Sequence, residues 1–380
     1  MCKGLDVQLS CREEDKMSKL FESGAINGMA LSNRFVRAAT WEGMADDAGA
    51  PTQKLIKAMT ALAEGGVGLI ITSHCYVSPD GQASIAQISM HKDEMIESLR
   101  NMTASVHGAG GKIVAQLSHA GNFADEKLSG RPPMVASNFE GLARTPRREM
   151  TLQDIQETVS AFAKAAWRAK SAGFDGVQIH GAHGFLLSEF LSPAYNRRHD
   201  AYGGPIENRA RFILEVYKAV RDATGKDYPV LVKINCQDFI ENGLTLEDSI
   251  KTTSLLAEAG LDAVEVSGGM LTERRLSPVR AGIDSVEKEA YFQEEARAFR
   301  KQIHIPLILL GGIRSFELAE RLVEEGTADY ISMARPFIRE PGLINRWKTG
   351  DRGKARCISD NRCILAGREG KGIYCHNEKE

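Results

Sequence analysis

Short apolar runs alternate with longer amphipathic stretches along the chain from Leu20 onward. The runs are rich in Val, Ile and Leu and too short for helices, which is typical of strands buried on both faces of a parallel sheet. Eight such runs predict eight strands, at residues 35–39, 67–73, 112–117, 176–180, 230–234, 263–266, 307–310 and 330–333. A stretch with helical spacing of its apolar residues follows each predicted strand.

The amphipathic stretches carry recognisable helix start signals. Thr151-Leu-Gln-Asp154 precedes the stretch 155–172 and resembles a capping box with Asp in place of Glu. Thr245-Leu-Glu-Asp248 stands in the same way before a stretch that runs to Ala259. Glycine follows several of these stretches, where it favours a left-handed helix stop.

Eight β/α units without a break in composition predict an α/β fold, a single (β/α)8 TIM barrel over residues 19–350. A doubly wound sheet is the alternative, and the absence of G-x-G-x-x-G after the first strand weakens it. Residues 1–18 are expected to form a poorly ordered extension, and 351–380 a cysteine-containing tail. Insertions at 121–150 and 268–285 follow the third and sixth strands and are candidate lids.

Composition narrows the classes of partner. The formal net charge is −2, which provides no electrostatic footprint for nucleic acid or an anionic membrane. No segment approaches the roughly 20 apolar residues that span a bilayer, and the polar N-terminus lacks the apolar centre of a secretory signal. We therefore expect a cytoplasmic protein. The seven cysteines are an odd number, so a complete disulfide framework is not expected.

The stretch GVQIHGAHGFLLSEFLSP, residues 176–193, holds the first candidate chemistry. His180 ends a predicted strand and His183 follows three residues later, at the barrel end where such enzymes keep their active sites. The small residues between them would let a planar ring approach the backbone. Two satisfied structural histidines are the simpler interpretation, and the pair is otherwise an anion clamp beside an apolar wall that begins at Phe185.

The last two strands predict a phosphate site. Gly311-Gly312 follows the seventh strand and Ala334-Arg335 the eighth, where barrels usually bind phosphate. Glycine exposes backbone N–H groups to an anion, and arginine pairs with phosphate oxygens. Gln116 and Lys233 lie within other strands, and a buried lysine is costly unless an anionic group pairs with it. Together these residues indicate a phosphorylated, ring-bearing cofactor across the barrel mouth.

With these residues the chain resembles the old yellow enzyme superfamily of FMN-dependent oxidoreductases. It resembles more closely the branch that contains 2,4-dienoyl-CoA reductase and trimethylamine dehydrogenase. The resemblance covers about Leu20 to Cys375. It rests on many motifs in the same order: NRFV at 33–36, GLII at 68–71, QLSHAG at 116–121, HGAHGFLLSEFLSP at 180–193, NR at 196–197, DAYGG at 200–204, ENR at 207–209, Gly311-Gly312 and Arg335.

The resemblance implies that FMN lies at the carboxyl end of the barrel. Lys233 would lie near N1 and O2 of the flavin, where a cation stabilises the anionic reduced form. His180 and His183 would bind and polarise a substrate oxygen above the ring. The other implied cofactor contacts are Ala38, Ala39 and Thr40 near N5, His74 along the same edge, Gln116 at the pyrimidine, and Gly311, Gly312, Ala334 and Arg335 at the phosphate.

Phe185 departs from the family pattern, which usually has tyrosine two residues after the second histidine. The tyrosine hydroxyl is thought to protonate the substrate carbon, and losing a general acid typically costs about 10²–10⁴-fold in rate. Phenylalanine has no proton to give. Either the reaction needs no such acid, or solvent supplies the proton, or another group does; the sequence offers Tyr76, Tyr195, Cys75 and Thr40.

The cysteines near the C-terminus depart from the pattern of iron–sulfur relatives. Cys357, Cys363 and Cys375 remain, and Asp360 stands where a fourth cysteine is expected. Such clusters are usually held by four thiolates. The sequence leaves a [4Fe–4S] cluster open and favours degenerate cysteines. Because the chain stops at Glu380 without the nucleotide-binding domains of some relatives, NAD(P)H docking directly or an electron-transfer partner is expected to supply electrons.

These observations predict hydride transfer between flavin N5 and a small-molecule substrate, most simply reduction of a C=C bond conjugated to a carbonyl. Oxidation of a C–H or N-methyl group is the alternative within flavin chemistry. A flavin-free aldolase or isomerase that binds a sugar phosphate is the alternative from another class, and a non-catalytic flavin binder is a third. Arg275, in the insertion at 268–285, is a candidate contact for an anionic substrate, and a homo-oligomer is expected.

Overall fold

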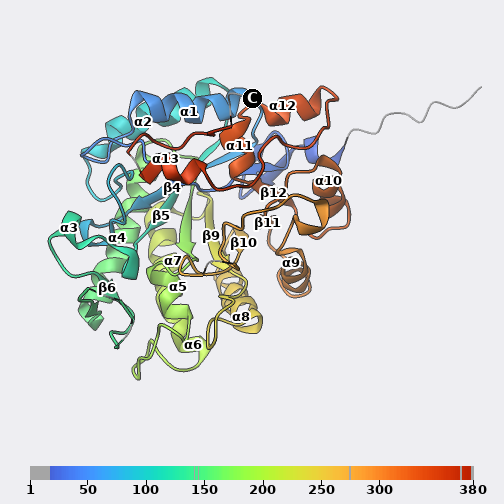
Figure 1. Cartoon of the computed structure of the whole chain (residues 1–380). Coiled ribbons are helices and arrows are strands. Elements are labelled where there is room, and N and C mark those ends of the chain that lie inside the picture. Colours follow the sequence, from blue (N-terminus) through green and yellow to red (C-terminus); the bar gives the residue numbers. More distant parts are fainter. Residues whose placement is uncertain (1–17, 141, 144, 274, 369, 378–380) are drawn as a thin grey trace, which may run out of the picture.

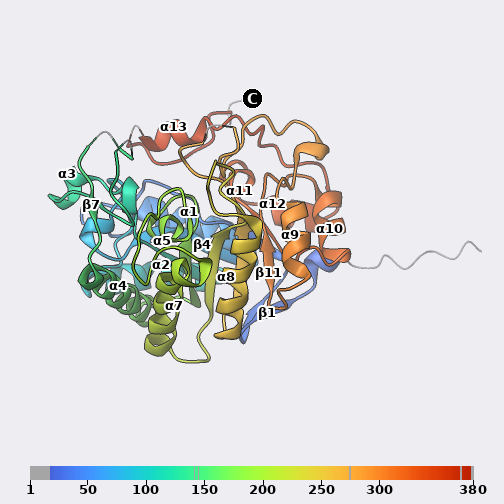
Figure 2. The same cartoon turned by 90° about the horizontal axis from the view of Figure 1, so that it is seen from below.

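Eight parallel strands close into a barrel in the order β10-β11-β12-β3-β4-β5-β8-β9, with helices around them (Figures 1 and 2). The computed structural model describes residues 18–377 except 141, 144, 274 and 369. The predicted TIM barrel is confirmed. Its strands are β3 (Phe35–Arg37), β4 (Leu69–Tyr76), β5 (Ile113–Ser118), β8 (Gly176–Gly181), β9 (Val230–Asn235), β10 (Ala263–Ser267), β11 (Leu307–Leu309) and β12 (Tyr330–Met333).

The predicted helix starts are confirmed as well. Thr151 and Asp154 form a reciprocal capping box at the start of α4 (Leu152–Ser171), and the Thr245 side chain caps α8 (Leu246–Glu258). The other long helices are α1 (Gln53–Glu64), α2 (Met95–Gly108), α7 (Arg211–Thr224), α9 (Gln293–Arg300) and α10 (Phe316–Glu324). The shorter ones include α5 (Leu186–Leu191), α6 (Ile206–Arg209), α11 (Arg335–Arg339), α12 (Leu343–Lys348) and α13 (Cys363–Arg368).

An antiparallel hairpin that the sequence analysis missed closes the amino-terminal end of the barrel. It consists of β1 (Gly24–Ile26) and β2 (Met29–Leu31), joined by a turn in which Asn27 and Gly28 have φ of 42° and 76°. An Asn-Gly turn between alternating apolar residues is a strong hairpin signal. The apolar side chains of the hairpin pack against Val36, Leu69, Ile71, Val114, Leu231, Ala263, Ile308 and Tyr330 inside the barrel.

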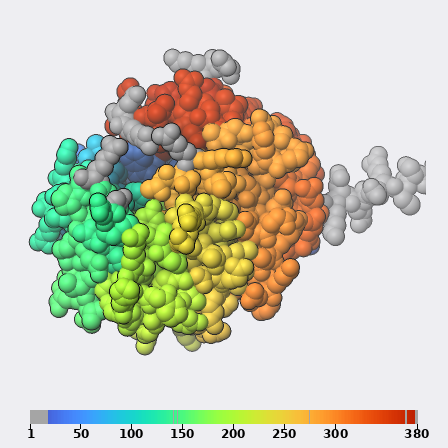
Figure 3. All heavy atoms as spheres, turned by 60° about the horizontal axis from the view of Figure 1, so that its bottom comes forward, coloured from blue at the N-terminus to red at the C-terminus, as the bar shows by residue number. Residues whose placement is uncertain are grey.

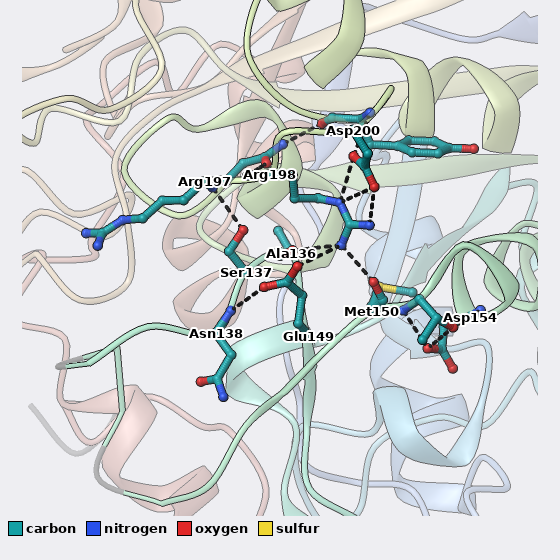
Figure 4. Close-up of polar contacts among 12 residues, drawn as sticks. Ala136, Ser137, Asn138, Glu149, Met150, Asp154, Arg197, Arg198 and Asp200 are labelled. Carbon is teal, nitrogen blue, oxygen red and sulfur yellow. Dashed lines mark hydrogen bonds and ion pairs between the residues drawn. The ribbon is translucent and has the colours of Figure 1, made fainter.

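The insertion at 121–150 contains α3 (Glu126–Ser129) and a parallel pair of two-residue strands, β6 (Met134–Val135) and β7 (Arg148–Glu149). Arg198 holds the ends of its outer loop together (Figure 4). The Arg198 guanidinium donates to the carbonyls of Ala136 and Met150, at 3.1 and 2.7 Å, and pairs with Asp200 at 2.5 Å. The loop therefore has a fixed base.

The second insertion and the tail lie on the same side of the molecule as the first (Figure 3). Among its described residues, the segment between Ser267 and the 3-10 helix η4 (Val286–Lys288) contains no helix or strand. The tail crosses the segment after β3, where Ile373 N donates to the carbonyl of Glu42 at 2.8 Å. Among the residues that the structure describes, no helix is both long and apolar enough to cross a membrane.

Candidate active site

The predicted site residues come together because parallel strands place their carboxyl ends at one mouth of the barrel. Each lies within a strand of the barrel or directly after one. The residues are Ala38, Ala39 and Thr40 after β3, His74 in β4, Gln116 in β5, His180 in β8 and His183 after it, Lys233 in β9, Gly311 and Gly312 after β11, and Ala334 and Arg335 after β12.

Three imidazoles and one phenyl ring pack against one another at this mouth. The ring centroid of Phe185 lies 4.5 Å from that of His180 and 5.2 Å from that of His74. The His180 and His183 rings meet edge to face at 5.3 Å. Phe185 is 5% exposed and also contacts Phe123 of the first insertion. The side chain that replaces the usual tyrosine is therefore part of an aromatic wall.

Burial keeps these imidazoles uncharged. It lowers the pKa of His74 to about 4, and the pKa values of His180 and His183 lie well below the usual range. For His180 and His183 the positive charge of Lys233 and the neighbouring imidazoles add to the effect of burial. A neutral imidazole keeps one N–H and one acceptor nitrogen. Near neutral pH each ring can thus donate one hydrogen bond without carrying a charge.

Two polar side chains, Asn235 and Ser267, hold His183 in place. Its backbone has a left-handed φ of 67°, its N–H donates to Asn235 Oδ1 at 3.1 Å, and its Nε2 lies 2.7 Å from Ser267 Oγ. The buried Nδ1 of His180, by contrast, has no hydrogen-bond partner. The two predicted oxygen-binding histidines therefore differ, because one ring nitrogen of His183 already has a partner on β10.

A chain of polar side chains crosses the barrel interior. Gln116 Nε2 donates to Gln178 Oε1 at 2.7 Å, and Gln178 Nε2 donates to Glu265 Oε2 at 2.9 Å. Ser332 Oγ donates to Glu265 Oε1 at 2.7 Å, while Lys233 Nζ lies 3.4 Å from Glu265 Oε2. The sequence analysis missed Glu265, although a lone carboxylate within the apolar strand Ala263–Ser267 was a usable signal.

The Lys233 ammonium keeps donors for another group. An ammonium has three N–H bonds, and the Lys233 side chain is 4% exposed. Its neighbour Glu265 already accepts hydrogen bonds from Gln178 and Ser332. A buried cation at the mouth suits an anionic ring system, so Lys233 fits the position that the resemblance implied beside flavin N1 and O2.

The rim after β11 and β12 fits a phosphate. Gly311 and Gly312 have φ of 139° and 75°, values that side chains disfavour, and a Cβ on Gly312 would meet the Tyr291 ring at 2.7 Å. Arg335 Nη1 donates to the carbonyl of Arg280 and to Asn361 Oδ1, at 2.8 and 2.7 Å. These bonds orient the guanidinium at the rim and leave its other N–H groups for an anion.

The segment after β3 forms the part of the rim next to β12. Ala38 N donates to the carbonyl of Met333 at 2.9 Å, which ties this segment to β12. Thr40 Oγ1 donates to the carbonyl of Ala38 at 2.9 Å. Trp41, which the sequence analysis did not single out, has a buried Nε1 without a hydrogen-bond partner and packs beside Gly367 of the tail.

Arg275 is exposed on the segment after β10. This segment lies against the loop after β8, since Leu271 N donates to the carbonyl of His183 at 3.2 Å. The position is compatible with the predicted contact to an anionic substrate.

The tail does not assemble the predicted iron–sulfur ligands. Within the described residues, no group of three or more His, Cys, Asp or Glu side chains is arranged to hold a metal ion. Asp360 accepts from Arg362 N and from Asn377 Nδ2, both at 3.2 Å, and Cys357 Sγ accepts from Ser359 N at 3.5 Å. The side chain in the fourth-ligand position thus caps a turn.

Fold and site define a class: (β/α)8 barrels with a phosphate-binding rim, a buried cation and uncharged imidazoles at the mouth. The chain belongs to the NADH:flavin oxidoreductase / NADH oxidase family, whose model matches residues 19–353. The resemblance to the old yellow enzyme superfamily is thereby confirmed. The match spans the whole barrel and every predicted FMN contact.

Known relatives agree with this assignment. The chain is 36% identical over 358 residues to an NADH oxidase of Thermoanaerobacter brockii, covering 92% of this chain and 54% of the relative. It superposes on 2-naphthoyl-CoA reductase in complex with 2-naphthoyl-CoA with a TM-score of 0.87 at 25% identity, covering 94% of this chain and 56% of that one. For the old yellow enzyme homologue from Zymomonas mobilis the TM-score is 0.74 at 29% identity, covering 88% and 94%. The chain thus spans about half the length of the first curated relatives it matches.

Proposed function

We propose that this protein is an FMN-dependent oxidoreductase that uses NAD(P)H to reduce a C=C bond conjugated to a carbonyl. The observation that carries the proposal is the cluster of uncharged imidazoles, His74, His180 and His183, next to the buried ammonium of Lys233. Neutral N–H donors polarise a carbonyl oxygen by donating hydrogen bonds to it. The phosphate rim would hold the flavin phosphate, and the Lys233 ammonium would hold the flavin ring.

Each residue has a defined task in this proposal. FMN, when bound, supplies the hydride. Lys233 holds negative charge at the pyrimidine side of the ring, Gly311 and Gly312 leave room for the phosphate, and Arg335 pairs with it. His180 has a buried ring nitrogen without a protein partner, and an N–H at that position donates to the substrate carbonyl oxygen. His183 is oriented for the same oxygen by Ser267 and Asn235.

Some relatives are named for reduction or NADH oxidation, while two structural neighbours are a histamine dehydrogenase and an amine oxidase. One relative is an NADH oxidase, and one structural neighbour is a reductase in complex with an aromatic acyl-CoA. A carbonyl conjugated to an unsaturated ring suits an aromatic wall that includes Phe185 and Phe123. Arg275 is then available to the anionic part of such a substrate.

Phe185 also favours a second candidate, the oxidation of a C–H or N-methyl group. In that direction hydride leaves the substrate and no carbon needs a proton, so a phenyl ring at this position costs nothing. The two functions differ in which redox state of the flavin the substrate reacts with.

Anaerobic stopped-flow spectroscopy of the FMN-loaded protein tests the proposal. NADH or NADPH should bleach the flavin absorbance, and a cyclic enone or an unsaturated acyl thioester should restore it. His180→Ala should slow the second step, whereas His107→Ala, whose ring pairs with Asp175 away from the mouth, should not. Bleaching of oxidised flavin by an amine or alcohol, together with no reaction towards any enone, would instead establish the second candidate.

A further inference from the structure

The proposed reduction needs a proton at the carbon next to the one that takes the hydride, and Phe185 cannot provide it. The Phe185 ring packs against the rings of His74, His180 and Phe123, so a phenyl ring without an acidic hydrogen occupies this place in the wall. The proton must therefore come from solvent or from another element that reaches the same wall.

Three of the four groups that the sequence offered are directed elsewhere. Cys75 is fully buried and its thiol donates to the carbonyl of Ser73 at 3.4 Å. The Tyr76 ring stacks on His91 at 5.2 Å, and its hydroxyl lies 3.1 Å from the position of a Cβ on Gly49. The Thr40 hydroxyl donates its hydrogen bond to the carbonyl of Ala38. An alcohol is also a far weaker acid than a phenol.

Most other tyrosines already donate their hydroxyl hydrogen bonds to acceptors within the protein. Four hydroxyls donate to identified acceptors: Tyr202 to the Glu215 carboxylate, Tyr228 to the carbonyl of Phe174, Tyr291 to the carbonyl of Pro278, and Tyr330 to the carbonyl of Ala25. Tyr217 is buried beneath Arg221, and Tyr374 lies in the tail beside His376. The tail runs along the segment after β3, which β4 and β5 separate from the strand that ends at the histidines.

Tyr195 differs from all of these. It follows α5 and reaches across to the segment after β10, where its hydroxyl lies 3.4 Å from Thr272 Oγ1. The residue before Thr272, Leu271, donates its N–H to the carbonyl of His183, and the Met270 methyl group lies 3.1 Å from the position of a Cβ on Gly184. The tyrosine hydroxyl thus contacts the segment whose residues 270 and 271 lie against Gly184 and His183.

The backbone around Tyr195 is fixed. Tyr195 N donates to the carbonyl of Ser192 at 3.1 Å, and the side chain of the next residue, Asn196, donates to the carbonyls of Phe190 and Tyr202, each at 2.7 Å. Burial raises the pKa of Tyr195, so its hydroxyl keeps its proton at neutral pH. Its neighbour Thr272 is exposed, which gives water access to the pair.

The geometry points to Tyr195 as the proton donor for the reduced carbon, with Thr272 as its link to solvent. This inference rests on the proposed function. The C=C bond takes a hydride, with its electron pair, at one carbon; the Tyr195 O–H bond breaks and its proton forms the C–H bond at the other carbon. The tyrosinate then takes a proton from water. The two electrons come from NAD(P)H through the flavin, and the balance needs no further reactant.

Tyr195→Phe in the FMN-loaded protein tests the assignment. Reoxidation of the reduced flavin by a cyclic enone should slow by about 10²–10⁴-fold, the usual value of a general acid, while its reduction by NADPH keeps the wild-type rate. The solvent isotope effect on reoxidation should rise, since proton transfer becomes limiting. Phe185→Tyr added to Tyr195→Phe should recover much of the rate because it restores a phenol beside His180. Tyr76→Phe is the matched control and should reoxidise like wild type.

The outcomes separate the two ideas. If wild type reacts with the enone and Tyr195→Phe matches it, the assignment is wrong and the proposed function stands. If Tyr195→Phe is slow but its isotope effect is unchanged and the second substitution brings no recovery, Tyr195 has a structural role and the assignment is again wrong. If wild type reacts with no enone at all, both fail together.

Discussion

Glu265 is the charged centre of the polar contacts inside the barrel, and Glu265→Gln measures what they contribute to stability. The carboxylate is fully buried, accepts from Gln178 and Ser332, and lies 3.4 Å from Lys233 Nζ. The substitution leaves the Lys233 ammonium buried without an opposite charge, and it places an NH₂ group where one of the carboxylate oxygens accepted a hydrogen bond. Removing one partner of a buried ion pair typically costs about 3–5 kcal/mol.

That cost translates into a measurable melting temperature. An unfolding entropy of about 2.1 cal/mol/K per residue amounts to about 0.8 kcal/mol/K for the 380 residues of this chain. The expected decrease in Tm is therefore about 4–6 °C. We would follow it by far-ultraviolet circular dichroism of flavin-free protein, so that cofactor binding does not enter the result. Ser332→Ala, which removes one hydrogen bond of about 1 kcal/mol, is the control and should lower Tm by only about 1 °C.

A double-mutant cycle with Lys233→Met decides whether the two charges are coupled. Each single substitution leaves one buried charge unpaired, whereas the double substitution leaves none. The double variant should therefore lose clearly less stability than the two single variants together. Single-variant decreases in Tm that simply add in the double variant would refute the reasoning, because the 3.4 Å contact would then carry no interaction energy.

Three further predictions follow from other contacts. Arg335→Met should weaken FMN binding at least about tenfold and leave riboflavin binding unchanged in fluorescence titrations; equal losses for both would exclude a phosphate contact. Arg198→Met should make the loop between Ala136 and Met150 sensitive to limited proteolysis, because it removes the hydrogen bonds to both loop ends. The control is Arg197→Met, since the exposed Arg197 only stacks on the Phe139 ring and its loss should not increase cleavage. Equal cleavage of the two variants would contradict the role of Arg198 in holding the loop ends together. Burial raises the pKa of Glu189 from 4.5 to about 8, so its contribution to stability is present below pH 4.5 and is lost as pH rises to 8. The Glu189→Gln variant does not titrate, so its unfolding free energy minus that of wild type should increase by up to about 1.4 kcal/mol per pH unit over that range. Urea denaturation measures this difference. A difference that stays constant with pH would show that the pKa of Glu189 is not shifted.

The sequence by itself determined the architecture and the position of the mouth. Apolar runs, helix caps and glycines are local signals, so the eight strands, the start of α4 and the rim at Gly311 and Gly312 could all be predicted. The polar residues Gln116 and Lys233 stood out because their strands are otherwise apolar. The strand ends were less certain: β4 continues to Tyr76, past the predicted end at residue 73.

Only the tertiary structure decided which side chains contact one another. Glu265 meets Gln178 and Ser332, residues 87 and 67 positions away, because closure of the barrel fixes the register between its strands. The same register places Ser267 on His183, and the loops that extend from it bring Thr272 to Tyr195. Local periodicity assigns a residue to a strand or a helix, but it carries no information about which distant residue will lie beside it. The family motifs therefore indicated the cofactor, whereas the proposed proton donor follows only from the packing of the loops.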